Sequence, residues 1–108
     1  MIVEMREYTL HPGKVPDYLK LYEHEGMEIQ RRILGRMVGY YSTEIGPSIN
    51  QIVHLWAYDS LDDRLERRKR LQADPGWQAY VRKMRPMLAA QTNRILNPAP
   101  FFDTEETR

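Results

Sequence analysis

The chain has 108 residues, of which 42% are apolar and 29% are charged, and its formal net charge is +1. That length suits one domain with a single core, and the balanced charge lacks the basic excess expected of a nucleic-acid-binding protein. The absence of cysteine excludes disulfide bonds, thiolate nucleophiles and cysteine-ligated metals. Because no apolar run approaches the ~20 residues of a membrane span and no signal-peptide pattern is present, we expect a small cytoplasmic domain without membrane insertion.

The first two elements differ in their hydrophobic period. Residues 2–10 alternate between polar and apolar and predict a strand, which ends at the turn signal His11-Pro12-Gly13. Residues 15–33 then place apolar or small side chains at helical spacing, which predicts one continuous helix that stops near Gly35. Gly26 lies within this stripe, and we expect its missing side chain to allow a close approach to the sheet.

The middle of the chain predicts a hairpin followed by a broken helix. Residues 37–44 and 51–58 are rich in β-branched and aromatic side chains, and turn residues separate them. Ser60 then begins a second helical stretch, with an acidic residue three positions later in the arrangement of a capping box. Asp74 and the proline after it resemble a fresh helix start, so we expect the stretch to break there.

The first half of this second helical stretch is dense in arginine. Leu61 and Leu65 give it an apolar edge, and residues 64–70 give it a charged one. Acidic residues dilute this charge and no aromatic residue is interleaved with it. We therefore interpret it as a solvated helix face rather than a phosphate or nucleic-acid site.

The remaining segments complete the architecture. A last strand is expected over residues 87–97, followed by an extended segment at 98–102 and a polar, frayed tail at 103–108. The order strand, helix, strand, strand, helix, strand predicts an α+β fold of the ferredoxin-like βαββαβ type. Its two helices should cover one face of an antiparallel sheet. We take residues 1–102 as the single domain.

Two helices cover only one side of such a sheet, so the residues on its open face matter. Along residues 51–58, one face carries Val53, Leu55 and Ala57, and the other carries Ile52, His54, Trp56 and Tyr58. We assign the smaller aliphatic set to the helix side. That leaves the aromatic set on the open face, together with Arg6 and Tyr8. An exposed patch of this kind marks a partner or ligand surface, and a second copy packed sheet against sheet would cover it.

An ordered set of short segments between residues 2 and 101 resembles the NIPSNAP family. The segments are Glu4-x-Arg6-x-Tyr8-x-Leu10, Pro12-Gly13, Gly39-Tyr40, Glu44-Ile45-Gly46-Pro47, His54-Leu55-Trp56-Ala57-Tyr58-Asp59-Ser60, Asp74-Pro75-x-Trp77, Arg94-Ile95-Leu96 and Pro98-Ala99-Pro100-Phe101. The resemblance implies a dimeric α/β barrel, in which the sheets of two chains face each other around an enclosed space. It also implies that residues 1–102 form one NIPSNAP-like domain.

The wider superfamily that this resemblance implies includes cofactor-free monooxygenases, haem-degrading enzymes and lactone isomerases. The NIPSNAP family itself has no agreed reaction and therefore offers no catalytic residues to transfer to this chain. Its eukaryotic members are mitochondrial, but nothing in this sequence resembles a mitochondrial presequence, so we expect a cytoplasmic protein of bacterial type.

His54 is the candidate catalytic residue, because it can titrate near neutrality and lies between apolar neighbours. It is either a general base or polar anchor facing a ligand, or a structural histidine held by cross-strand partners. Trp56 lies on the same face, where it either stacks on an aromatic ligand or packs in the dimer core.

Arg6 and Tyr8 complete the set of candidate ligand-binding residues. Their guanidinium and phenol groups suit a carbonyl or carboxylate. Alternatively, Arg6 forms a buried ion pair with Glu4 or Glu44.

These residues leave three function classes open. The leading hypothesis is a homodimeric binding protein whose barrel encloses a small apolar or aromatic molecule. The second is a cofactor-free monooxygenase or isomerase with His54 as the base. The third is a structural or interaction protein with a filled barrel. We expect no cofactor and no metal, because His24 and Glu28 have ligand-like spacing but lack a third ligand.

Overall fold

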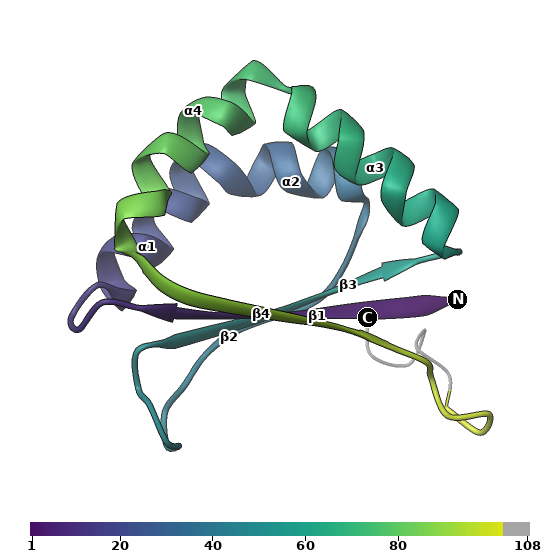
Figure 1. Ribbon diagram of the computed structural model, residues 1–108, viewed down its shortest axis with the longest axis horizontal. Helices are drawn as coiled ribbons and strands as arrows, with labels where there is room; N and C mark the ends of the chain where they lie inside the picture. The colour runs from purple at the N-terminus through teal and green to yellow at the C-terminus, as the bar shows by residue number, and fades with distance from the viewer. Residues whose placement is uncertain (103–108) are drawn as a thin grey trace.

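The computed structural model describes residues 1–102, and the predicted tail at 103–108 lies outside this described part. Its elements, in chain order, are β1 (Ile2–Leu10), α1 (Val15–Leu21), the π-helical η1 (Tyr22–Gly26), α2 (Met27–Leu34), β2 (Arg36–Ser42), β3 (Gln51–Tyr58), α3 (Leu61–Ala73), α4 (Pro75–Met84), the 3-10 helix η2 (Arg85–Met87) and β4 (Leu88–Leu96). The strands form one antiparallel sheet in the order β2-β3-β1-β4, and all the helices lie on one side of it (Figure 1). The predicted α+β, ferredoxin-like fold is confirmed. Within residues 1–102, no helix is both long and apolar enough to span a bilayer.

The first helical layer differs from the single helix that its period predicts. A π-helical turn at Tyr22–Gly26 separates α1 from α2, and Gly35, with φ of +92°, ends α2. A β-carbon at Gly26 would lie 3.1 Å from ring carbons of Tyr80 on α4. The prediction that Gly26 lets the helix approach the sheet is therefore wrong, because the close neighbour is another helix.

The predicted break between α3 and α4 is confirmed. The Ser60 hydroxyl accepts a hydrogen bond from the Asp63 backbone N–H at 3.0 Å, and the Asp74 carboxylate accepts one from the Trp77 N–H at 2.9 Å. Each side chain therefore satisfies a donor that a helix start would otherwise leave without a partner. The bend at Asp74 makes α3 and α4 an arch above the sheet (Figure 1).

The two faces of the sheet carry the opposite residues from those expected. In the register of β1 and β3, Glu4 pairs with Trp56, Arg6 with His54, and Tyr8 with Ile52, and all six residues are buried. Rings from α1, η1 and α4 pack over this face, including those of Tyr18, Tyr22 and Tyr80. The aromatic set of β3 therefore lies on the helix side. The prediction that placed it on the open face is wrong, because the helices supply large rings that a layer of small aliphatic residues would not fill.

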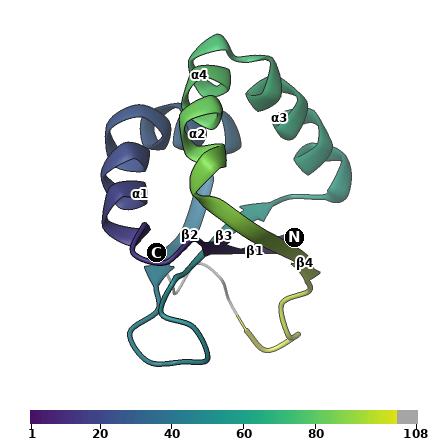
Figure 2. The ribbon, with the colours of Figure 1, turned by 60° about the vertical axis from the view of Figure 1, so that its left-hand side comes forward.

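The open face of the sheet is aliphatic at its centre. It carries Val3 and Met5 from β1 and Val53, Leu55 and Ala57 from β3. Two segments extend beyond the sheet on this helix-free side, namely the β2–β3 loop and the chain after β4 (Figures 1 and 2). Their tips carry exposed apolar residues, and Phe101 is 91% exposed.

Candidate functional site

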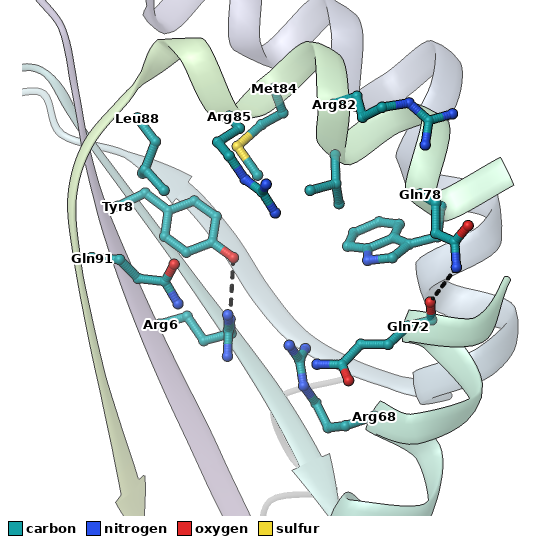
Figure 3. Close-up of a pocket in the computed structure, with 12 residues that line it drawn as sticks. Arg6, Tyr8, Arg68, Gln72, Gln78, Arg82, Met84, Arg85, Leu88 and Gln91 are labelled. Atoms are coloured by element: carbon teal, nitrogen blue, oxygen red, sulfur yellow. Dashed lines mark hydrogen bonds between the residues drawn. The ribbon is translucent and has the colours of Figure 1, made fainter. Parts of the chain in front are cut away.

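A cavity of about 510 Å³ lies under the α3–α4 arch, against β1 and the start of β4 (Figure 3). One part of its wall is aromatic and aliphatic, formed by Tyr8, Trp77, Val81, Met84 and Leu88. The other part is polar, formed by Arg6, Arg68, Gln72, Gln78, Arg82, Arg85 and Gln91. No acidic residue lines the cavity within the described chain. A space of this size falls within the range of small-molecule pockets.

The cavity exists because the helices do not cover the whole sheet. β4 is an edge strand, and all its residues after Leu88 are exposed. α4 passes through η2 directly into β4, which places Arg85 and Leu88 on the rim (Figure 3). The arch therefore stands over β1 and β4 without filling the space above them.

A buried carboxylate lies next to the site without lining the cavity. Glu4 is fully buried, and its Oε2 accepts a hydrogen bond from Arg6 Nη1 at 3.0 Å. Arg64 on α3 binds the same carboxylate through two nitrogens, at 2.9 and 3.0 Å. Burial alone would raise the pKa of Glu4, but the hydrogen bonds from Arg64 and the charge of Arg6 hold that pKa below its ordinary value. Glu4 is therefore ionised, and the interpretation that Arg6 pairs with Glu4 is confirmed.

Arg68 lies close to this network without an ion-pair partner among residues 1–102. Burial lowers the pKa of its guanidinium, the positive charge of Arg6 lowers it further, and Glu4 offsets these effects only in part. Figure 3 shows the Arg68 side chain directed toward Arg6 and Gln72 inside the cavity. The prediction that residues 64–70 form a solvated face is therefore wrong for Arg64 and Arg68.

The face of α3 that packs toward the sheet is not the one that carries Leu61 and Leu65. Arg64, Arg68 and Leu71 point inward, at i, i+4 and i+7. Leu61 and Leu65, the expected apolar edge, are 59% and 50% exposed. The inward arginines are tolerated because the buried Glu4 carboxylate lies opposite them on β1.

Tyr8 and Arg6 bring polar groups to the cavity wall. Arg6 Nε donates a hydrogen bond to the Tyr8 hydroxyl at 3.2 Å, and the guanidinium carbon lies 5.7 Å from the centre of the Tyr8 ring. Both residues line the cavity, which lies on the helix side of the sheet and not on the open face predicted for them; their role in ligand binding stays a prediction.

His54 lies in the core next to this wall and does not itself line the cavity. Its ring stacks on Tyr40 and meets Tyr8 edge to face, with ring centres 4.6 and 4.8 Å apart. Its Nδ1 accepts a hydrogen bond from Trp56 Nε1 at 2.7 Å. Because an indole N–H only donates, the proton of the neutral imidazole is on Nε2, which has no hydrogen-bond partner within the described residues. Burial lowers the pKa of His54 to about 3, so the ring is neutral near pH 7.

The four predicted site residues lie close together in the structure but occupy two different positions. Arg6 and Tyr8 line the cavity, whereas His54 and Trp56 lie in the core. Sequence reasoning missed the contributions of α3, α4 and η2, above all Arg68. The four-residue spacing of Arg64 and Arg68 places them on one face of the helix. It indicates an inward-facing pair only when the carboxylate of Glu4 is known to lie opposite.

The structure has a second cavity, and its described residues include no cluster that could hold a metal ion. A second cavity of about 410 Å³ lies between α1 and β2 and is mostly apolar, with Leu19, Met27, Met37 and Tyr40 in its wall. Among residues 1–102, no group of three or more His, Asp or Glu side chains is placed to hold a metal ion.

The chain is similar to proteins of one family along almost its whole length. The NIPSNAP family model matches residues 3–102. A crystal structure of a NIPSNAP family protein with unknown function from Agrobacterium tumefaciens is 52% identical, with a TM-score of 0.91, over 94% of this chain and 91% of that one. Human protein NipSnap homolog 3A is 37% identical over 75 residues, which are 69% of this chain and 30% of that protein.

More distant likeness concerns the fold alone. A solved antibiotic biosynthesis monooxygenase superposes with a TM-score of 0.64 at 12% identity, over 93% of this chain and all of that one. The curated NipSnap relatives are much longer than the match, which spans 19% of the protein from Caenorhabditis elegans and 41% of the one from Dictyostelium discoideum. The activities and partners of those whole proteins therefore do not transfer directly to this chain.

Proposed function

We propose that this chain, which belongs to the NIPSNAP family, is a binding protein that holds a small amphipathic molecule in the cavity under the α3–α4 arch. The observation that carries the proposal is the cavity of about 510 Å³, whose wall combines aromatic and aliphatic side chains with several polar groups. Natural ligand sites combine a mostly apolar surface with a few polar groups that orient the ligand. The proposed ligand site lies on the helix side of the sheet rather than in a barrel between two sheets.

The arrangement of His54 favours binding over catalysis by that residue. A general base needs a free lone pair within reach of the substrate. The Nδ1 lone pair accepts from Trp56, Nε2 carries the proton, and the low pKa makes proton uptake unfavourable near neutrality. We infer that His54 orients Trp56 and supports the Tyr8 ring, and the monooxygenase or isomerase alternative stays a hypothesis without a base in the cavity.

We also infer that the protein is a homodimer that pairs its open sheet faces. The centre of this face consists of Val3, Met5, Val53, Leu55 and Ala57, of which Met5, Val53 and Leu55 are partly exposed in the single chain. An aliphatic surface of this kind favours burial, and sheet-on-sheet packing of two copies should bury on the order of 2,000 Å² in total. In such a dimer, each cavity would remain on the outer, helix-covered side of its own sheet.

The proposed binding function is tested by filling the cavity. Val81→Trp adds a large ring to the α4 wall, whereas Lys69→Trp adds the same ring to an exposed position of α3 outside the cavity. Ligand-observed NMR with a panel of aromatic acids, alcohols and amides measures binding to both variants and to the wild type. We expect compounds that bind the wild type to bind Lys69→Trp equally and to lose most of their binding to Val81→Trp.

Two outcomes would contradict this proposal. The first is binding that Val81→Trp leaves unchanged, and the second is a wild-type protein that binds no compound of the panel. Gln78→Trp, at the exposed rim, blocks the cavity without altering the core and serves if Val81→Trp melts at a lower temperature than the wild type.

A further inference from the structure

We infer that the ligand of this cavity is an organic acid, whose anionic group binds between Arg6 and Arg68 and whose apolar body packs against the α4 wall. The inference rests on the proposed binding function and specifies the chemical class of the ligand. It follows from three observations: the charge of the wall, the incomplete neutralisation of the arginines around Glu4, and the presence of apolar groups in the same cavity.

The wall of the cavity carries positive charge only. Arg6, Arg68 and Arg85 direct guanidinium groups toward the cavity, and no carboxylate lines it within the described residues. This distribution is not a property of the whole chain, which has 16 basic and 15 acidic residues. The positive charge is therefore gathered locally, and a cleft lined by one sign of charge attracts ligands of the other sign.

The buried part of this charge is only partly neutralised. The single carboxylate of Glu4 faces the guanidiniums of Arg6 and Arg64 in direct contact and that of Arg68 at longer range. One negative charge among three positive charges leaves an excess of two. Arg6 is 6% exposed and is therefore screened poorly by solvent, whereas Arg64 and Arg68 are half-buried. Burying a charge without a partner is unfavourable, and an anion between Arg6 and Arg68 would offset that penalty.

The chemistry of these groups suits a carboxylate. A guanidinium presents paired N–H donors that match the two oxygens of a carboxylate, and such charge-assisted hydrogen bonds are stronger than neutral ones. Figure 3 shows Arg6 and Arg68 approaching from opposite sides, from β1 and from α3, with the Gln72 amide beside them. Arg85 points toward the same space from the end of α4, while the Arg82 head group points away from it.

Apolar groups line the same cavity. Val81, Met84 and Leu88 belong to α4 and the start of β4, and Trp77 adds an aromatic surface from the same helix. A ligand whose acid group binds at Arg6 and Arg68 would therefore have an apolar surface on α4 against which its body can pack.

A matched pair of probes tests the acid group separately from the body. 1-Naphthylacetate is an anion, and 1-naphthylacetamide has the same aromatic body without the charge. Titration calorimetry should give a dissociation constant for the acid about 10- to 100-fold lower than for the amide, because the amide lacks the charge-assisted hydrogen bonds. Arg68→Gln should abolish this preference and leave the affinity for the amide within a factor of about three.

Arg70→Gln is the matched control, because it removes the same charge from an exposed position of α3 that forms an ion pair with Glu66. This variant should retain the preference for the acid. Arg85→Gln, at the exposed rim, provides a second test that does not depend on a buried residue, and it should reduce the preference. Melting temperatures of all variants show whether a loss of binding reflects a loss of fold.

The outcomes separate this inference from the proposed function. Equal affinity for the two probes would overturn the acid assignment and leave the binding function intact. A preference for the acid that falls equally in Arg68→Gln and Arg70→Gln would also overturn it, because general attraction rather than the cavity would then explain the preference. If neither probe binds at millimolar concentration, both the inference and the proposed amphipathic site are contradicted.

Discussion

The two faces of the sheet are built from the same strands and yet differ in what they bury. The helix-side face combines large rings with a charged network in which Glu4 is shared by Arg6 and Arg64. The open face carries Val3, Leu55 and other aliphatic residues without such a network. The comparison shows that large side chains fill the space between the sheet and the helices. Charged side chains can be buried there because each has an oppositely charged partner. The uncovered face, in contrast, has side chains short enough for another flat surface to pack on it.

The largest expected effect is from a charge placed at the centre of either face. Trp56→Glu, on the helix side, should lower the free energy of unfolding by at least about 4 kcal/mol, because it removes a fully buried ring and buries an anion. Leu55→Glu, one residue earlier and on the open face, should leave the monomer folded and prevent dimerisation. Urea unfolding and light scattering measure the two effects.

The opposite result for these two variants would contradict the assignment of the two faces. A folded, monomeric Trp56→Glu would mean that Trp56 belongs to the interface rather than to the core. A wild-type protein that is a folded monomer at micromolar concentration would remove the homodimer proposal altogether.

The next effect concerns the shared carboxylate. Glu4→Gln keeps the shape of the side chain but leaves Arg6 and Arg64 without their counter-ion, so we expect a loss of about 3–5 kcal/mol in the free energy of unfolding. Glu7→Gln is the matched control on the other side of β1, where the carboxylate accepts a hydrogen bond from Thr92. Equal stability of the two variants in urea would show that the network adds nothing to the fold.

The pH dependence of stability sharpens the contrast further. The pKa of His54 falls from 6.5 to about 3 on folding, so its contribution to stability is complete above pH 6.5 and is lost as the pH falls toward 3. The pKa of Glu4 is also lowered from 4.5, so its contribution is complete above pH 4.5 and is lost as the pH falls through the lower, folded value. Both groups therefore make the protein less stable in acid, in different pH windows.

His54→Gln isolates the first window, because the amide oxygen still accepts from Trp56 but does not titrate. The wild type should lose stability between pH 6 and 4.5 with a slope of about 1.4 kcal/mol per pH unit, and this variant should be flatter. His24→Gln, at an exposed histidine of η1, should follow the wild type. A wild-type slope in His54→Gln would show that His54 is not the group that titrates.

The smallest effect is expected from the segment after β4. Deleting residues 98–108 removes Phe101 and Phe102, which we expect to pack on the partner's open side in the dimer, where burial of each ring contributes about 1.5–3 kcal/mol. Deleting only residues 104–108 should change dimer stability little. Dilution experiments followed by light scattering compare the two truncations, and equal dissociation constants would show that the segment does not contact the partner.

The sequence by itself determined the elements and their order. The alternation over β1 and β3, the turn residues between β2 and β3, and the caps at Ser60 and Asp74 act over a few neighbouring residues. Local patterns of this kind are set by backbone geometry and capping hydrogen bonds, so they can be predicted without the rest of the chain. The same alternation also grouped Arg6 and Tyr8 with His54 and Trp56 correctly.

Only the tertiary structure decided which side of the sheet this group occupies. Alternation states which side chains share a face, but the covered face depends on the rings that distant helices supply, such as Tyr18 and Tyr80. The inward turn of Arg68 likewise depends on Glu4, which lies 64 positions away in the sequence. The cavity under the arch arises from the bend at Asp74 and the bare edge strand β4 together, and no local pattern contains both.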